Sequence, residues 1–349
     1  MKTLAAPAPL IQSIRLQRDR RRRELRRLCV LLGAVLMALA CVTLAIGQSV
    51  TAPLDVIRVL WGHEVPGVGF TVRELRLPRA VLGAVGGLSF GLAGAAFQVL
   101  LRNPLASPDI IGISAGAGAA AVFAIVFFGV SGGLVSVFAV LAALVVAMVI
   151  YLLAWRDGVA GGRLILIGIG VAAMLQSVTA YTLSKAPAWS LEEALRWLTG
   201  TLNGATLMQA VPVIVTLGIC GGILLLQGRA LGALQMGDEA AAAIGVSVAR
   251  TRLLVVLSAV GVIAVATAVC GPIAFVAFLS RPIASRMTRA SGPLLMTSAL
   301  TGAVLVLAAD YAGQFLLPSR YPVGIVTGAL GAPYLLYLLI RMHRKGALS

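Results

Sequence analysis

Few side chains in this chain of 349 residues could act as catalysts or metal ligands. The two histidines, His63 and His343, lie far apart in polar segments, whereas transition-metal sites need clustered His, Cys or carboxylate ligands. The four cysteines lie in or beside apolar runs and form no CxxC pair, so we interpret them as small hydrophobic residues. They are Cys29, Cys41, Cys220 and Cys270. We therefore predict no metal site.

Common catalytic motifs are also absent from the sequence. It contains no GxxxxGK[ST] phosphate loop, no HExxH, no GxSxG and no acidic cluster suited to a metal–diphosphate. We therefore predict no catalytic residue and no cofactor bound by this chain.

One polar stretch, LGALQMGDEAAAAIGVSVARTR (231–252), predicts a short helix. Asp238 suits its N-cap, and Glu239 is favourable in the first turn. Gly245 can end the helix in the left-handed conformation. The alanines and Ile244 between them form a narrow cylinder. This segment is either an ordinary connecting helix or a helix that fits a cleft in a partner protein.

The elements around this stretch are strongly apolar. The chain is 60% hydrophobic with a mean hydropathy of +1.00, which indicates that a bilayer surrounds most of it. The apolar runs do not alternate with polar residues, so they predict an all-α polytopic membrane protein rather than a barrel. We predict ten spans, at 28–47, 78–100, 109–130, 134–155, 164–183, 207–227, 253–271, 273–288, 293–309 and 322–341. The eighth is the weakest, because Arg281 and Pro282 interrupt it.

Charge distribution orients these spans. Ten spans place both termini on one side, which holds all but seven of the 28 Lys and Arg residues. The positive-inside rule then predicts that both termini lie in the cytoplasm. The block RLQRDRRRRELRR (15–27) precedes the first span, so the net charge of +16 points to anionic lipid rather than nucleic acid. We divide the chain into a basic segment 1–27, a ten-helix domain 28–341 and a tail 342–349.

Other patterns concern packing and the outer surface. The glycine-rich run GAVGGLSFGLAGAAF (83–97) predicts close helix packing. Short surface helices are predicted around PLDVIRVLWG (53–62) and within 184–206. The spans lack paired carboxylates of the kind that ion-driven carriers often use, and Asp310 stands alone near an outer end.

Five stretches, taken in order, resemble the FecCD-type permease family of bacterial ABC importers for ferric siderophores, haem and cobalamin. They include RLPR, RNPLA and PVGIVTGALGAP, and they lie at 76–122, 194–206, 237–246, 270–287 and 321–339. The resemblance implies ten helices per subunit, two permease subunits, two ATP-binding cassette subunits that bind ATP and Mg, and an extracytoplasmic substrate-binding protein. We slightly favour a paralogue over a second copy as the other permease.

The resemblance also implies roles for individual residues. It makes 237–245 the helix that contacts the ATPase, with Gly237, Asp238, Glu239, Ala240, Ala241 and Gly245 as its motif. Arg76 and Arg79 are expected to dock the binding protein, unless they only snorkel at the interface. A cytoplasmic gate is expected at Asn103 and Leu105 and, across the path, at Gly161 and Gly162, although Asn103-Pro104 also suits a simple turn.

The sequence departs from the family pattern at three positions. Arg281 stands before Pro282 where relatives commonly have a proline followed by histidine. Gln314 occupies a position where relatives tend to have arginine, and Arg320 one where they tend to have glutamate. An outer docking charge has thus either moved to Arg320 or been lost.

These observations together predict the permease subunit of an ABC importer, with no enzymatic activity of its own. A ferric siderophore is the expected cargo, with haem and cobalamin as alternatives. A secondary carrier driven by an ion gradient is a different hypothesis, and the missing carboxylate pairs count against it.

Overall fold

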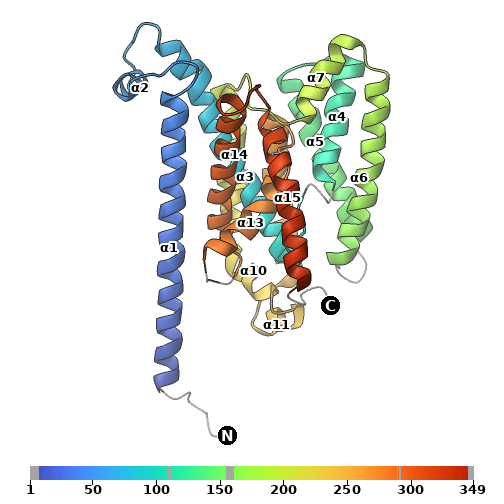
Figure 1. Ribbon diagram of the computed structural model, residues 1–349. Coiled ribbons are helices and arrows are strands. Elements are labelled where there is room, and N and C mark those ends of the chain that lie inside the picture. Colours follow the sequence, from blue (N-terminus) through green and yellow to red (C-terminus); the bar gives the residue numbers. More distant parts are fainter. Residues whose placement is uncertain (1–7, 109–111, 155–160, 289, 291, 345–349) are drawn as a thin grey trace.

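The computed structural model describes residues 8–108, 112–154, 161–288, 290 and 292–344, and every regular element within them is a helix (Figure 1). The long helices are α1 (Ala8–Ala45), α3 (Leu77–Leu100), α4 (Ile113–Phe128), α5 (Gly133–Ala154), α6 (Gly161–Ser184), α12 (Val248–Cys270), α13 (Val276–Met287), α14 (Leu295–Phe315) and α15 (Val323–Arg344). The shorter ones are α2 (Pro53–Leu60), α7 (Ala188–Leu198), α8 (Leu207–Thr216), α9 (Gly222–Leu226), α10 (Gly228–Leu234) and α11 (Asp238–Ala243). Two π-helical turns complete the set, η1 (Thr71–Arg76) before α3 and η2 (Leu217–Gly221) between α8 and α9.

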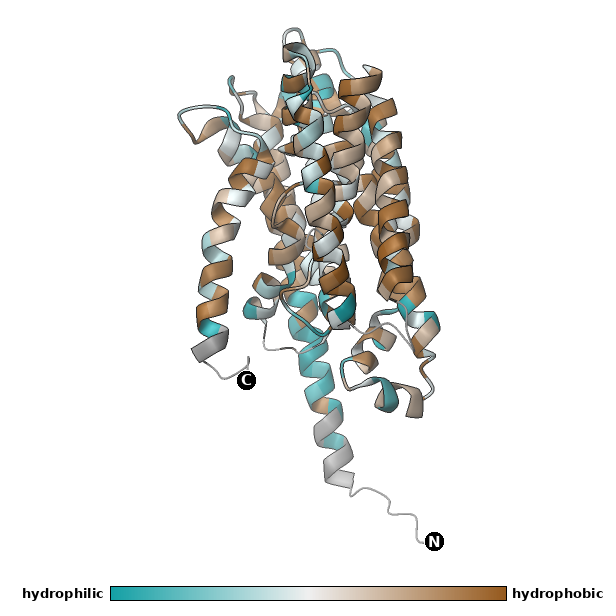
Figure 2. Ribbon diagram, turned by 90° about the vertical axis from the view of Figure 1, so that its right-hand side faces the viewer, coloured by the Kyte–Doolittle hydropathy of each residue, from teal (hydrophilic) through white to brown (hydrophobic). Residues whose placement is uncertain are grey.

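Eight helical segments in the described part of the chain are long and apolar enough to cross a membrane. They are Arg15–Ala45, Thr71–Leu100, Gly133–Ala154, Gly162–Ser184, Leu207–Leu226, Val248–Cys270, Leu295–Phe315 and Val323–Arg341. The helix shafts are mostly hydrophobic in Figure 2, with polar residues near their ends. The chain is therefore an all-helical, multi-pass membrane protein, as predicted.

Two of the ten predicted spans correspond to shorter helices. The span predicted at 109–130 contains α4, which has 16 residues, and the one at 273–288 contains α13, which has 12. A helix rises about 1.5 Å per residue, so neither helix alone crosses a hydrocarbon core of about 30 Å. The count of ten stays a prediction.

Helix α3 is the centre of the bundle and packs against α12, α13 and α14. The predicted close packing of its glycine-rich run is confirmed. A Cβ atom on Gly87 would lie 2.5 Å from the Ala303 Cα atom of α14, and one on Gly94 would collide with the Ala277 carbonyl of α13. Small residues thus let three backbones meet directly, which stabilises helix association inside a membrane.

The first helix continues without a break from the basic segment into the first predicted span. Helix α1 continues from Ala8 to Ala45 and packs mainly along α14. Its basic half extends past the end of the bundle (Figure 1 and Figure 2). The boundary predicted at residue 27 is therefore a change in composition within one continuous helix.

The two ends of the bundle differ in their short helices. The predicted surface helices are present as α2 and α7, and both lie at the upper end in Figure 1. Helices α10 and α11 lie at the lower end, where α1 begins and α15 ends. The first described helix therefore begins on the side where the last one ends, and the cytoplasmic location of that side stays a prediction.

Candidate functional site

The short helix predicted in the polar stretch 231–252 is present as α11. It begins at Asp238 after Gly237, whose φ of 115° only glycine adopts readily, and it is followed by Gly245 with a φ of 88°. The expected N-cap is wrong by one residue, because Gly237 occupies that position and no side chain caps the helix. The Asp238 carboxylate is instead engaged in ion pairs.

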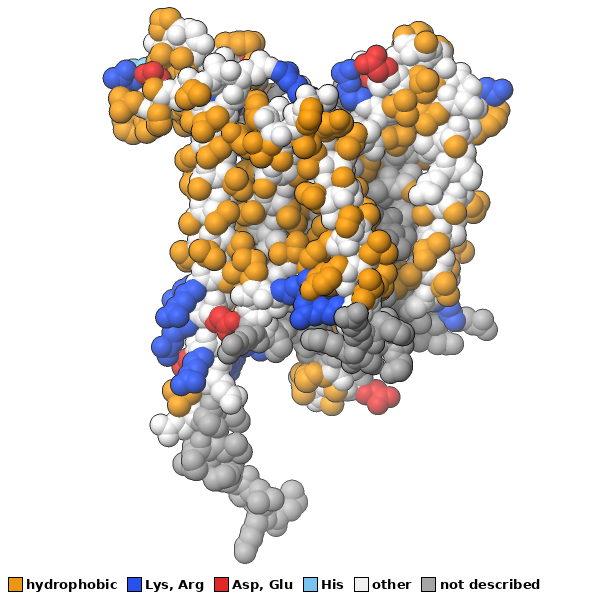
Figure 3. Space-filling view, viewed as in Figure 1, with side chains coloured by type: hydrophobic (Ala, Val, Ile, Leu, Met, Phe, Trp, Pro, Cys, Tyr) orange, Lys and Arg blue, Asp and Glu red, His pale blue; other side chains and the backbone are white. Residues whose placement is uncertain are grey.

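Most of the α11 surface faces away from the bundle. Ala241 is fully buried, whereas Glu239, Ala240, Ala242, Ala243 and Ile244 are exposed. In Figure 3 an acidic side chain lies close to hydrophobic ones at the lower end of the molecule, where Figure 1 places α11. An exposed helix with small side chains, one acid and one isoleucine presents a narrow surface on which another protein could fit.

Asp238 links α11 to two other parts of the end of the bundle at which α11 lies. Following the predicted orientation, we call this end the inner end and the opposite end, with α2 and α7, the outer end. Its Oδ1 accepts a hydrogen bond from Arg102 Nη2, and its Oδ2 accepts one from Arg252 Nη2 at 2.7 Å. Arg102 Nε also donates to the Leu234 carbonyl at 2.7 Å. From the sequence alone, Arg102 and Arg252 contribute only to the positive charge of one side, although Arg102 opens the RNPLA motif. We call Arg102, Asp238 and Arg252 the inner ion cluster.

Asn103 and Leu105, the first predicted half of the gate, form a turn directly after Arg102. The Asn103 Oδ1 atom accepts a hydrogen bond from the Leu105 backbone nitrogen at 2.9 Å. The Leu105 side chain packs against the apolar cluster of Phe278, Leu279 and Leu338. The turn is therefore joined through the backbone to the inner ion cluster and through Leu105 to α13 and α15.

Gly161 and Gly162, the second predicted half of the gate, lie at the first turn of α6. A Cβ atom on Gly162 would meet nothing within 4 Å. Residues 155–160, which precede them, lie outside the described part of the chain. The gate role of all four residues stays a prediction.

At the outer end, Arg76 is only 8% exposed. Its guanidinium donates to the carbonyls of Leu44 and Ser49 at 2.8 and 2.7 Å and to the Thr51 hydroxyl at 3.2 Å. The chain after α1 thus wraps around this side chain, and the structure gives Arg76 a role in holding that loop. Its predicted docking role stays untested, but little of the residue is accessible to another protein.

Arg79 forms a two-pronged ion pair with Asp310 of α14. Its Nε and Nη2 atoms donate to the two carboxylate oxygens at 2.6 and 2.7 Å, and its Nη1 donates to Asn203 Oδ1 at 2.9 Å. The side chains of Arg79 and Asp310 are 18% and 3% exposed. Asp310, predicted to stand alone among the carboxylates of the spans, is therefore paired with an arginine of α3. Gln314, one of the positions that depart from the family pattern, also reaches Asn203, at 3.5 Å.

Arg320 is the most accessible of the three arginines predicted for docking. It lies after α14 and contacts the side-chain amide of Gln48. With the oxygen of that amide facing Arg320, the oxygen accepts hydrogen bonds from the guanidinium.

Arg281 lies inside α13, where its Nη2 donates to the Gly292 carbonyl at 3.3 Å. Its Nε has no hydrogen-bond partner within the described part of the chain.

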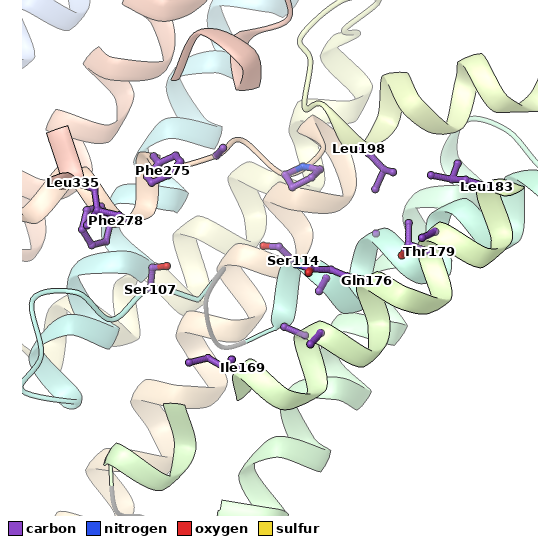
Figure 4. A pocket seen from close by; sticks show the side chains of 17 residues that line it. Ser107, Ser114, Ile169, Gln176, Thr179, Leu183, Leu198, Phe275, Phe278 and Leu335 are labelled. Carbon is purple, nitrogen blue, oxygen red and sulfur yellow. The ribbon is translucent and has the colours of Figure 1, made fainter. Parts of the chain in front are cut away.

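A cavity of about 780 Å³ opens between α4, α6, the segment 272–278 and α15. Figure 4 shows Gln176, Thr179 and Leu183 of α6 on one side and Phe275, Phe278 and Leu335 on the other. The remaining described lining comprises Ser107, Ser114, Ile169, Leu198, Pro272 and small alanine and glycine residues. None of the described lining residues is ionisable, and in the described part of the chain no three His, Cys, Asp or Glu side chains gather to form a metal site.

Comparison with known proteins places this geometry in context. Residues 35–341 match the FecCD transport family. The chain is 40% identical over 328 residues to FepG, the ferric enterobactin transport system permease protein of Escherichia coli K12. This alignment covers 90% of this chain and 98% of FepG. It is 35% identical over 283 residues to FepD, a permease protein of the same named system and organism, which covers 79% of this chain and 84% of FepD.

The fold also matches a solved structure. An inward-facing conformation of a metal-chelate type ABC transporter aligns with a TM-score of 0.79 at 24% identity. The alignment covers 90% of this chain and 99% of the other. This likeness supports the helical arrangement described above.

Proposed function

Because the chain belongs to the FecCD transport family, we propose that this ABC importer permease carries ferric siderophores across the bacterial inner membrane. The family consists of membrane permease components, so the chain is a transport subunit and not an enzyme in itself. The observation that carries the proposal is the open, uncharged cavity between α6 and α15.

The chemistry of this cavity favours a cargo that brings its own metal ligands. A siderophore surrounds its iron completely, whereas haem iron takes axial ligands such as His, Cys, Met or Tyr from a protein. The described lining residues include none of these four types. Both relatives named above are permeases of a ferric enterobactin system, which points to the same cargo class. Cobalamin, which also carries its own ligands, is the second candidate.

Energy for transport comes, in this proposal, from two ATP-binding cassette subunits that bind ATP and Mg. The sequence has no nucleotide-binding motif, and α11 offers an exposed surface at the inner end. One cassette subunit would hold α11 of this chain, and its closure on ATP would move the helix. The inner ion cluster would then carry that movement to the turn at 103–105.

Two further partners complete the proposed assembly. The cavity is open, and many side chains of α6 are exposed, so a second permease would close the path from the other side. FepG and FepD are two different permeases of one system, which supports a paralogue in that role. An extracytoplasmic binding protein would deliver the siderophore to the end that carries α2, α7 and Arg320.

Uptake measurements test cargo and driving force together. We expect cells that lack this chain to lose uptake of radiolabelled ferric siderophore while haem and cobalamin uptake continues. Inactivating the ATPase subunit should stop the uptake, whereas an uncoupler applied with ATP levels maintained should not. Loss of cobalamin uptake alone would reassign the cargo, and sensitivity to the uncoupler alone would replace the ABC mechanism with an ion-driven carrier.

A further inference from the structure

A second groove lies far from the cavity, at the point where the basic half of α1 meets the bundle. Its volume is about 580 Å³. Arg20, Arg23 and Arg27 line its polar part, and Leu28, Leu31 and Met287 line its apolar part. The wall opposite α1 is therefore the end of α13.

The three arginines lie on one face of α1. Successive residues of a helix are separated by about 100°, so Arg20, Arg23 and Arg27 fall within an arc of about 60°. Leu31 continues the same stripe toward the apolar half of the helix. The other arginines of this block include Arg15, Arg18 and Arg22, which have the same spacing and fall on the opposite face.

The groove changes from charged to apolar along the helix axis. From Arg20 to Leu31 the helix rises about 16 Å, which is comparable to a lipid headgroup with the first part of an acyl chain. This change coincides with the start of the first apolar run, and the part of α1 that extends below the bundle is mostly polar in Figure 2. A ligand that fills the groove must therefore be anionic at one end and apolar at the other.

Among the described residues that line the groove, Glu24 is the one acid, and it joins the two walls. The Thr288 hydroxyl, at the end of α13, donates to Glu24 Oε1 at 2.8 Å. This bond engages one carboxylate oxygen with the groove wall. The carboxylate still opposes an anion, but the described lining residues, three arginines and Glu24, carry a net charge of +2.

We propose that this groove is a binding site for one anionic phospholipid from the leaflet at the inner end of the bundle. The guanidinium groups hold the phosphate, and Leu28, Leu31 and Met287 contact an acyl chain. Basic pockets at membrane–water boundaries bind such headgroups. The bound lipid would fasten α1 to the end of α13. The proposal requires only that the spans lie in a bilayer, so it does not depend on the cargo.

The test compares two triple variants of the full-length chain, purified with its associated subunits. The variant R20Q/R23Q/R27Q removes the groove face, and R15Q/R18Q/R22Q removes the same charge from the opposite face. Binding of phosphatidylglycerol and of phosphatidylcholine is measured by native mass spectrometry. Each arginine near a membrane surface contributes about fivefold in affinity, so we expect the groove variant to bind phosphatidylglycerol roughly 100-fold more weakly.

The control variant should bind phosphatidylglycerol much more tightly than the groove variant, because it leaves the groove intact. Equal losses in both variants would mean diffuse attraction by the whole basic block and would overturn the site. If the natural chain bound phosphatidylcholine as tightly as phosphatidylglycerol, the site would also be overturned, since lipid charge would then not select the ligand. Displacement by millimolar glycerol phosphate would assign the groove to a soluble phosphate. Binding of phosphatidylglycerol only after the ATPase subunits are released would assign the groove to a protein partner.

Discussion

The ion pair between Arg79 and Asp310 predicts that Asp310→Asn destabilises the protein strongly. The carboxylate is 3% exposed and accepts two charge-assisted hydrogen bonds, at 2.6 and 2.7 Å. Removing one partner of a buried pair leaves the other charge uncompensated, which costs about 3–5 kcal/mol. Arg79 keeps its bond to Asn203 and is 18% exposed, so we expect the lower end of this range, about 3 kcal/mol.

The assay is the free energy of unfolding in mixed micelles, measured for a double-mutant cycle. Arg79→Met and Asp310→Leu should each be destabilising, and the double variant should lie closer to the natural chain than either single variant, because no buried charge is left. Arg196→Gln is the matched control. It removes an ion pair to Glu192 whose side chains are 64% and 78% exposed, which should change stability by less than about 0.5 kcal/mol.

Two outcomes would refute this reasoning. An Asp310→Asn protein within about 0.5 kcal/mol of the natural chain would show that the pair is solvated in the membrane-bound protein. A double variant that loses the sum of the two single effects would show that the residues do not interact energetically.

Three further predictions concern the two ends of the bundle. Asp238→Asn should lower stability by at most about 2 kcal/mol, because it weakens two partly exposed ion pairs, yet it should lower siderophore uptake per ATP hydrolysed; unchanged coupling would exclude the inner ion cluster. Glu239→Arg should reduce co-purification with the ATPase, and normal co-purification would contradict the role of α11. Arg320→Glu should weaken binding-protein affinity most at low salt. An affinity unchanged at low ionic strength would remove Arg320 from the docking surface.

Features that depend on neighbouring residues could be predicted from the sequence. Apolar run length located the spanning helices, because a bilayer requires each backbone segment to satisfy its own hydrogen bonds. The same local logic located α2, α7 and α11, and it predicted the left-handed Gly245. The spans predicted at 109–130 and 273–288 are longer than α4 and α13, since an apolar run does not by itself mark where a helix begins and ends.

Features that depend on distant residues could not be predicted. Arg79 and Asp310 are 231 positions apart, and Arg102 and Asp238 are 136 apart. An arginine at the start of a span is expected to reach water, but the segment after α1 wraps around Arg76 and accepts its hydrogen bonds. A glutamate at that position would therefore disturb the fold, so a docking test that replaces both Arg76 and Arg79 would confuse misfolding with lost binding.

The contrast between the two ion-pair systems indicates how the ends of the bundle differ mechanically. The outer pair joins α3 to α14 in a buried setting, so separating it would cost several kcal/mol, and we expect that end to move as one unit. The inner ion cluster has side chains that are 20–41% exposed, where each pair contributes about 0.2–1 kcal/mol. Such pairs can break and re-form at small cost. Because Arg102 directly precedes Asn103 and also binds the end of α10 and the start of α11, we expect a shift of α11 to act on the turn at 103–105 without disturbing the core around α3.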